Sequence, residues 1–126
     1  MKQKYIIGDI VEYDNKVMAI KEHRDGNHFD LSCPKEGLVY CFVGVEDIKP
    51  VSLTPEILKK NGWNEDCKWY KLTTKRAYLY ITKDTKSNDE FLVCAGSDKH
   101  NLASVSFVHE LQHLLFGLGL NSEMEV

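Results

Sequence analysis

The sequence predicts an α+β protein that has an all-β first half and a mixed second half. Three observations support this fold class: β-rich segments separated by turn signals fill the first half, a proline-led helix follows, and an amphipathic helix comes near the end. With 126 residues, 43% of them hydrophobic and 28% charged, the chain has the composition of a globular protein of one or two small domains. We therefore expect two parts, residues 1–51 and residues 52–126, that pack against each other.

Four short strands are expected in the first part, in the segments GDIVEY, KVMAIKEH, HFDLSC and LVYCFVGV. The turn signals between the first three are Asp14-Asn15 and residues 25–27, which read Asp-Gly-Asn. Strands of this length, which begin at Gly-Asp-x-Val and end at EDIKPV, predict a small SH3-like β-barrel. Such barrels bind peptides, proteins or nucleic acids, and the fold alone does not choose among these partners.

The second part is expected to open with a short helix in the segment SLTPEILKKNGW. Thr54 suits the N-cap, Pro55 suits the first helical position, and Gly62 suits the residue beyond the helix end. The segments KWYKL, AYLYITKD and EFLVCAG then predict a short antiparallel sheet. Side chains alternate in the middle segment, so we expect a core-facing set of Ala77, Leu79 and Ile81 and a water-facing set of Tyr78, Tyr80 and Thr82.

The last predicted element is a C-terminal amphipathic helix over about residues 101–118, capped by Gly119. On a helical wheel its apolar side chains form an arc about 120° wide, which is typical of a helix docked on a sheet. His109 and His113 lie roughly 160° from Leu111 on this wheel, so we expect both histidines to face outward. The apolar stripe consists of Phe107, Val108, Leu111, Leu114, Leu115 and Leu118.

The pattern His-Glu-x-x-His occurs in this helix, as His109, Glu110 and His113. Two histidines four residues apart can hold zinc while the glutamate between them acts as general base. A catalytic zinc also needs a third protein ligand, and the glycine and histidine that extend the motif in metzincins are replaced by Phe116 and Gly119. We therefore favour a docking helix in a non-enzymatic protein without a cofactor. The alternative is a zinc metallohydrolase in which both histidines hold the metal and Glu110 is catalytic.

The chain resembles a family of small uncharacterised proteins of Bacteroidota and of their phages and mobile elements. The resemblance rests on the GDIVEY opening, the segment EDIKPVSLTPEILKKNGW, the Trp-Tyr pair that follows and the closing segment FVHELQHLLFGLGLNSEMEV. These features occur in the family's order and span most of the chain. Relatives often read His-x-Leu-Gln-Asn where this chain has residues 109–113, which implies that the second histidine is dispensable. The family has no agreed activity, so the resemblance assigns no catalytic residues.

A binding surface is predicted on the strands of the second part, where cationic and aromatic side chains mix in the segment KWYKLTTKRAYLY. Cationic groups beside aromatic rings favour nucleotides or single-stranded nucleic acids. The alternative is an ordinary hairpin whose aromatic rings pair across strands and whose lysines protect an edge. The candidate residues are Lys68, Trp69, Tyr70, Lys71, Lys75, Arg76, Tyr78 and Tyr80.

Charge is spread evenly: residues 1–51 carry seven Lys or Arg against nine Asp or Glu, and residues 52–126 carry nine against ten. Because of this balance, we do not expect a protein whose affinity depends mainly on neutralising phosphates. The four cysteines lack C-x-x-C spacing, which is typical of reduced thiols. No apolar run suits a signal peptide or reaches the roughly 18 residues of a membrane span, so we expect a cytoplasmic protein.

The function expected from the sequence is that of a non-enzymatic binding or adaptor protein of phage or mobile-element origin, in the cytoplasm of a bacterial host. Its partner is expected to be a protein or a nucleotide, without membrane contact. The exposed loop HRDGNH, residues 23–28, is a candidate for protein recognition, and an ordinary hairpin turn is the alternative. A homodimer that covers some of Tyr78, Tyr80 and Phe116 is a further expectation.

Overall fold

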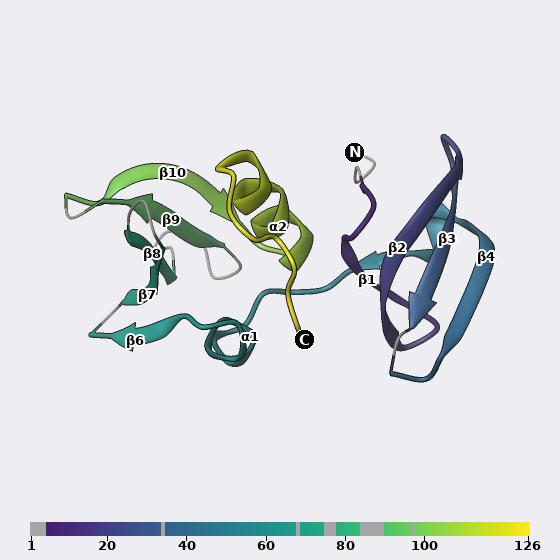
Figure 1. Ribbon diagram of the computed structural model, residues 1–126, viewed down its shortest axis with the longest axis horizontal. Coiled ribbons are helices and arrows are strands. Elements are labelled where there is room, and N and C mark those ends of the chain that lie inside the picture. The colour runs from purple at the N-terminus through teal and green to yellow at the C-terminus, as the bar shows by residue number, and fades with distance from the viewer. Residues whose placement is uncertain (1–4, 34, 68, 75–77, 84–89, 97) are drawn as a thin grey trace. The chain divides into compact units, whose positions relative to one another are not determined.

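A computed structural model of the chain (Figure 1) describes residues 5–33, 35–67, 69–74, 78–83, 90–96 and 98–126. The chain divides into two compact units, Met1–Val51 and Ser52–Val126. Each unit contains an antiparallel five-stranded sheet, and the second also contains two α-helices, so the predicted α+β class is confirmed. No helix in these described ranges is both long and apolar enough to cross a membrane.

The first unit is a sheet in which strands that follow one another in the chain pair with each other. Its elements are β1 (Ile10–Tyr13), β2 (Lys16–Asp25), β3 (His28–Cys33), β4 (Leu38–Gly44), the 3-10 turn η1 (Val45–Asp47) and β5 (Lys49–Pro50). All four segments predicted to be strands form strands, and their order in space is β4-β3-β2-β1-β5. Over the described part of the unit, no backbone pairing joins the two edge strands β4 and β5. Hydrogen bonding therefore does not close the sheet into a barrel.

The two predicted hairpin turns of this unit are confirmed, each for a local chemical reason. Asp14 and Asn15 connect β1 to β2 with φ of 51° and 60°. This left-handed pair of residues matches the twist of a hairpin best, and aspartate and asparagine tolerate it. In the β2–β3 turn, the Asp25 carboxylate accepts the backbone N–H of Asn27 at 2.8 Å. Short polar side chains therefore stabilise both turns.

Alternate side chains of these strands form the apolar core of the first unit. The Tyr5 ring meets the Phe29 ring edge-on, with 6.1 Å between the ring centroids. Burial raises the pKa of the Tyr5 hydroxyl, and Asp9 raises it further. Removal of these side chains from water is the main source of stability for a unit of this size. The core comprises Tyr5, Val11, Met18, Ile20, Phe29, Leu31, Cys33, Val43 and Ile48.

The second unit combines its sheet with two helices. Its elements are α1 (Pro55–Lys60), β6 (Asn64–Asp66), β7 (Trp69–Thr73), β8 (Tyr78–Lys83), β9 (Phe91–Ala95), β10 (His100–Val105) and α2 (Val108–Gly117). The strands lie side by side in chain order, from β6 at one edge to β10 at the other. α2 follows β10 directly and packs on it (Figure 1).

The helix ends of this unit follow the sequence predictions. Thr54 caps α1, because its Oγ1 accepts the N–H of Ile57 at 3.3 Å, and Gly62 follows the helix with φ of 87°. Gly119 caps α2 with φ of 73°, and its N–H donates to the Phe116 carbonyl at 3.0 Å. Capping is predictable because it depends on residues close together in the chain.

The start of α2 differs from the prediction, because residues 100–105 form the edge strand β10 instead of the first turns of the helix. Pairing with β9 places Val105 opposite Phe91, and both side chains are buried in the core. The hydrogen bonds between β9 and β10 also satisfy backbone N–H and C=O groups that a helix would otherwise have satisfied internally. A tertiary contact thus overrides the helical pattern of the sequence.

Truncation of the buried stripe of α2 should destabilise the second unit. Leu111→Ala and Leu115→Ala each remove a buried side chain and should lower the free energy of unfolding by about 2–5 kcal/mol. Phe116→Ala is the control, because this side chain is exposed and surface changes usually cost less than about 0.5 kcal/mol. Chemical denaturation followed by circular dichroism measures all three variants. Equal losses would contradict the described packing of α2.

Candidate functional site

His109 of the His-Glu-x-x-His pattern is buried, with 2% of its surface exposed, so the prediction that it faces outward is wrong. Gln112 lies on the same helical face, three residues later, and is buried too. His113 is half-buried, and 5.6 Å separate its ring centroid from that of His109. The helical wheel misled because it assumed one covered face, whereas α2 is covered on a second face as well.

Residues 121–126 provide part of that second cover. Gln112 Nε2 donates to the Ser122 carbonyl at 3.1 Å, and Met124 is buried. At the end of α1, the Asn61 side-chain amide donates to the Glu125 carbonyl at 2.8 Å and accepts the Glu125 N–H at 2.7 Å. Side chains from both helices therefore hold this segment through its backbone.

The Glu110 carboxylate caps the start of α2. Its Oε1 accepts the backbone N–H of Ser106 at 2.8 Å and that of Phe107 at 3.0 Å. This is the carboxylate half of a capping box, and Phe107 has no side-chain oxygen to form the other half. Within the described ranges, no three His, Cys, Asp or Glu side chains lie close enough together to hold a metal ion. In that part of the chain, His109 and His113 therefore meet no third ligand.

A row of alternating rings and ammonium groups lies on one face of the second sheet. Lys71 Nζ lies 4.0 Å from the centroid of the Tyr78 ring and 5.8 Å from that of Tyr80. Lys99 Nζ lies 4.6 Å from the centroid of Tyr80 and 5.6 Å from that of Trp69. We call these five residues the cation–aromatic ladder. It unites four predicted residues with Lys99, which the sequence analysis missed because it comes from the distant β9–β10 turn.

Tyr80 contradicts the prediction that it faces water, because only 8% of it is exposed. Its neighbours in the ladder cover it, and the Trp69 ring meets it edge-on with 6.2 Å between centroids. Leu79 and Ile81 are buried and Tyr78 is exposed, as predicted. The alternation of β8 is thus confirmed, and only the predicted exposure of Tyr80 on its outer face is wrong.

Among the remaining candidates for this surface, Tyr70 is described and does not join the ladder. Tyr70 pairs with Ile81 across β7 and β8. It therefore lies on the core-facing side of the sheet, opposite to Lys71. The other candidates and one predicted core residue lie outside the described residues: Lys68, Lys75, Arg76 and Ala77.

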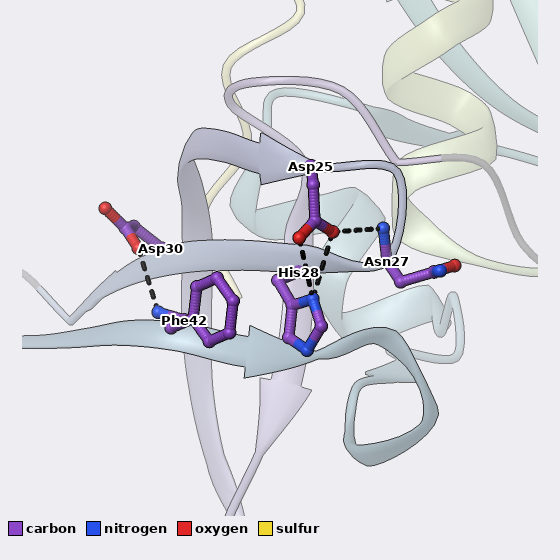
Figure 2. A network of polar contacts seen from close by, with 5 residues as sticks. All are labelled: Asp25, Asn27, His28, Asp30 and Phe42. Atoms are coloured by element: carbon purple, nitrogen blue, oxygen red, sulfur yellow. Dashed lines mark hydrogen bonds and ion pairs between the residues drawn. The ribbon is translucent and has the colours of Figure 1, made fainter.

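The turn HRDGNH carries a stacked pair of rings that reaches the edge strand β4 (Figure 2). The His28 and Phe42 rings lie 4.0 Å apart between centroids and 8° from parallel. Both oxygens of the Asp25 carboxylate approach His28 Nδ1, at 2.9 and 3.1 Å. His23, the other histidine of this segment, packs instead against the Phe29 ring. We call the stacked rings of His28 and Phe42 the platform.

Phe42 occupies a strained backbone position that a buried carboxylate holds in place. Its φ is 57°, which is unusual for a large side chain, and 58% of the residue is exposed. The β3–β4 register shifts here, so that Cys41 and Phe42 together oppose Asp30 in a β-bulge. Asp30 Oδ1 accepts the Phe42 N–H at 3.0 Å (Figure 2), and the Arg24 guanidinium donates to Asp30 Oδ2 at 2.6 and 2.8 Å.

The sequence analysis missed Asp30 and Phe42. The only local signal was a carboxylate in the middle of the strand segment HFDLSC, where a charge needs a partner if it is buried. That partner, Arg24, lies on the neighbouring strand β2. The bulge itself depends on how β4 pairs with β3, which the sequence does not reveal.

Two carboxylates beside the platform are held in their charged form. The Arg24 guanidinium, and after it the Phe42 N–H, holds the pKa of Asp30 below its usual value. The Asn27 N–H, and after it the His28 ring, does the same for the pKa of Asp25. A carboxylate whose pKa is lower in the folded state stabilises that state above its unfolded pKa. This contribution is lost as the pH falls through the folded pKa.

Acidification should therefore release the platform below the unfolded aspartate pKa of about 3.9, as Asp30 and Asp25 become protonated. The amide NMR signal of Phe42 should move over this window. Asp30→Asn should weaken the acid response, because the neutral amide has no charge to lose. Asp14→Asn changes an exposed turn carboxylate and should leave the response intact. If Asp30→Asn responds to acid as the wild type does, Asp30 does not hold the platform.

His109→Ala should lower the free energy of unfolding by roughly 0.5–3 kcal/mol, and by more than His113→Ala, because His109 is the more deeply buried of the two. A chelator should leave the melting temperature of the wild type unchanged. Under the zinc alternative, the chelator lowers that temperature as much as either histidine change does. Thermal melts of the three proteins with and without chelator distinguish these outcomes.

No family model, no curated protein and no solved structure matches the chain. Its function is therefore inferred from its own two surfaces, the platform and the cation–aromatic ladder.

Proposed function

We propose that the chain is a non-enzymatic binding or adaptor protein that recognises an extended segment of a partner protein at the β4 edge of its first unit. The exposed and strained Phe42 of the platform is the observation that carries this proposal. An SH3-like barrel is the proposed architecture of this unit, and five antiparallel strands around one core support it. Phage or mobile-element origin and a location in the cytoplasm of a bacterial host belong to the same proposal, supported by the resemblance described above.

Strain at an exposed aromatic residue favours a role in recognition. A large side chain at a left-handed φ costs on the order of 1–3 kcal/mol, and such positions cluster at functional sites. The Asp30–Arg24 pair maintains the strained backbone, and stacking on His28 holds the Phe42 ring in one orientation. A ring held in place before binding loses little entropy when a partner covers it.

β4 offers a partner both backbone and side-chain contacts. As an edge strand, it directs alternate N–H and C=O groups away from the sheet. Residues 38–44 contain no charged side chain, and Leu38, Val39 and Phe42 are exposed along them. An extended peptide can add to such an edge as a further strand, with main-chain bonds for affinity and side-chain contacts for specificity.

The zinc hydrolase alternative requires Glu110 to act as general base, whereas its carboxylate caps α2. Its Oε1 already accepts two backbone N–H groups, and loss of such a helix cap costs about 1 kcal/mol. This contact supports a non-enzymatic function. Elemental analysis of untagged, dialysed protein should find well under one zinc per chain, and a stoichiometric zinc would favour the hydrolase.

Phe42→Gly should remove peptide binding and keep the fold, because glycine adopts φ of 57° without strain and has no ring. Peptides selected on the wild-type protein from a random display library should bind this variant at least about tenfold more weakly. They should also shift the amide NMR signals of residues 38–44. The thermal stability of the variant should equal or exceed that of the wild type.

Phe116→Ala is the matched control for this experiment, because it removes an exposed aromatic ring from the second unit. The selected peptides should bind this control as they bind the wild type. Peptides that bind Phe42→Gly with undiminished affinity, or that shift only signals of the second unit, overturn the proposed site.

A further inference from the structure

The cation–aromatic ladder keeps two ammonium groups close together on the outer face of the second sheet. Lys71 Nζ and Lys99 Nζ lie 5.8 and 4.6 Å from the centroid of the same Tyr80 ring, and are therefore about 10 Å apart at most. Tyr78 and Trp69 provide a second ring for each lysine. Both positive charges are thus placed by their contacts with the aromatic rings.

Neither ammonium group forms an ion pair with a carboxylate in the part of the chain that the structure describes. The lysine ion pairs found there are those of Lys16 and Lys59. A ring contact leaves an ammonium group with N–H donors for an anion, because the ring covers only one side of it. Since the rings already restrain both lysines, an anion that binds them costs less side-chain entropy than it would at mobile lysines.

We propose that the cation–aromatic ladder binds the phosphate–base units of a nucleotide or a single-stranded nucleic acid. Lys71 and Lys99 contact the phosphates, and the ring of Tyr78, which is 44% exposed, stacks on a base. This site is on the second unit and does not depend on the peptide site proposed for the first.

Asp66 allows a test in which a substitution is expected to strengthen nucleic-acid binding instead of weakening it. It pairs with Trp69 across β6 and β7, so its side chain lies on the same face of the sheet as the ladder. Its negative charge repels phosphate at the Trp69 end of the ladder and favours phosphates nearer to Lys71. Asp66→Asn should therefore strengthen nucleic-acid binding, whereas loss of either ladder lysine should weaken it.

Fluorescence anisotropy of a labelled oligothymidylate of about twelve nucleotides, titrated with the full chain, tests the site. Sequence-independent binding in the range of about 10⁻⁶ to 10⁻⁴ M is expected. Two phosphate contacts predict a loss of affinity of about sevenfold between about 50 and 200 mM salt, since each contact to a single strand contributes about 0.7 to the logarithmic slope. Lys71→Gln and Lys99→Gln should each reduce that slope by about 0.7.

Lys49→Gln is the matched control, because it makes the same charge change at an exposed residue of the first unit. It should leave the affinity and the salt slope close to wild type, as should Phe42→Gly. Tyr78→Ala should weaken binding at least about fivefold through lost stacking. Circular dichroism of each variant checks that it is folded.

Competition with adenosine triphosphate distinguishes the two sources of the ligand. If adenosine triphosphate displaces the oligonucleotide at a similar concentration of phosphate groups, a free nucleotide is sufficient for binding. If it does not displace the oligonucleotide, the ligand is the single strand. No anisotropy change at about 10⁻⁴ M protein and 50 mM salt overturns the proposal. Equal binding by the Lys71, Lys99 and Lys49 variants overturns it as well, and neither result affects the peptide site.

Discussion

Both units depend on one constraint: an antiparallel sheet in water needs a covered face, because its apolar side chains project to one side. The first unit covers that face with its own strands around Met18, Ile20 and Leu31. In the second, the buried apolar side chains include Leu79 and Ile81 of the sheet and Leu111 and Leu115 of α2. Once these residues cover one face, the side chains that alternate with them are left for contacts on the other. His28 of the platform and Lys71 and Tyr80 of the cation–aromatic ladder are such side chains, whereas Phe42 lies in a bulge and Lys99 in a turn.

Two residues of the pattern His-Glu-x-x-His have structural roles at the start of α2. Glu110 satisfies backbone N–H groups at the start of α2, where a negative charge is also favoured by the helix dipole. His109 fills a buried position on the second covered face, beside Gln112. Capping by Glu110 and packing by His109 are therefore roles that these two residues have in the fold.

The two proposed binding surfaces use charge in opposite ways to hold aromatic rings. In the platform, Asp25 and Asp30 fix His28 and the backbone of Phe42. In the ladder, lysines lie against the rings themselves. The first arrangement leaves an uncharged edge suited to a peptide strand, and the second leaves ammonium groups suited to phosphate. The even distribution of charge along the sequence did not predict this difference, because the two arrangements form only when residues distant in the sequence come together.

The sequence by itself determined the strands of the first unit, the turn at Asp14 and Asn15, and the helix caps at Thr54 and Gly119. Each of these depends on residues a few positions apart, so local chemistry is sufficient. Tertiary structure alone decided that β10 replaces the start of the last helix and that His109 is buried. It also brought Lys99 to Tyr80 and Asp30 to Phe42. These contacts join separate strands and turns, and their energy comes from pairing and packing that no local pattern encodes.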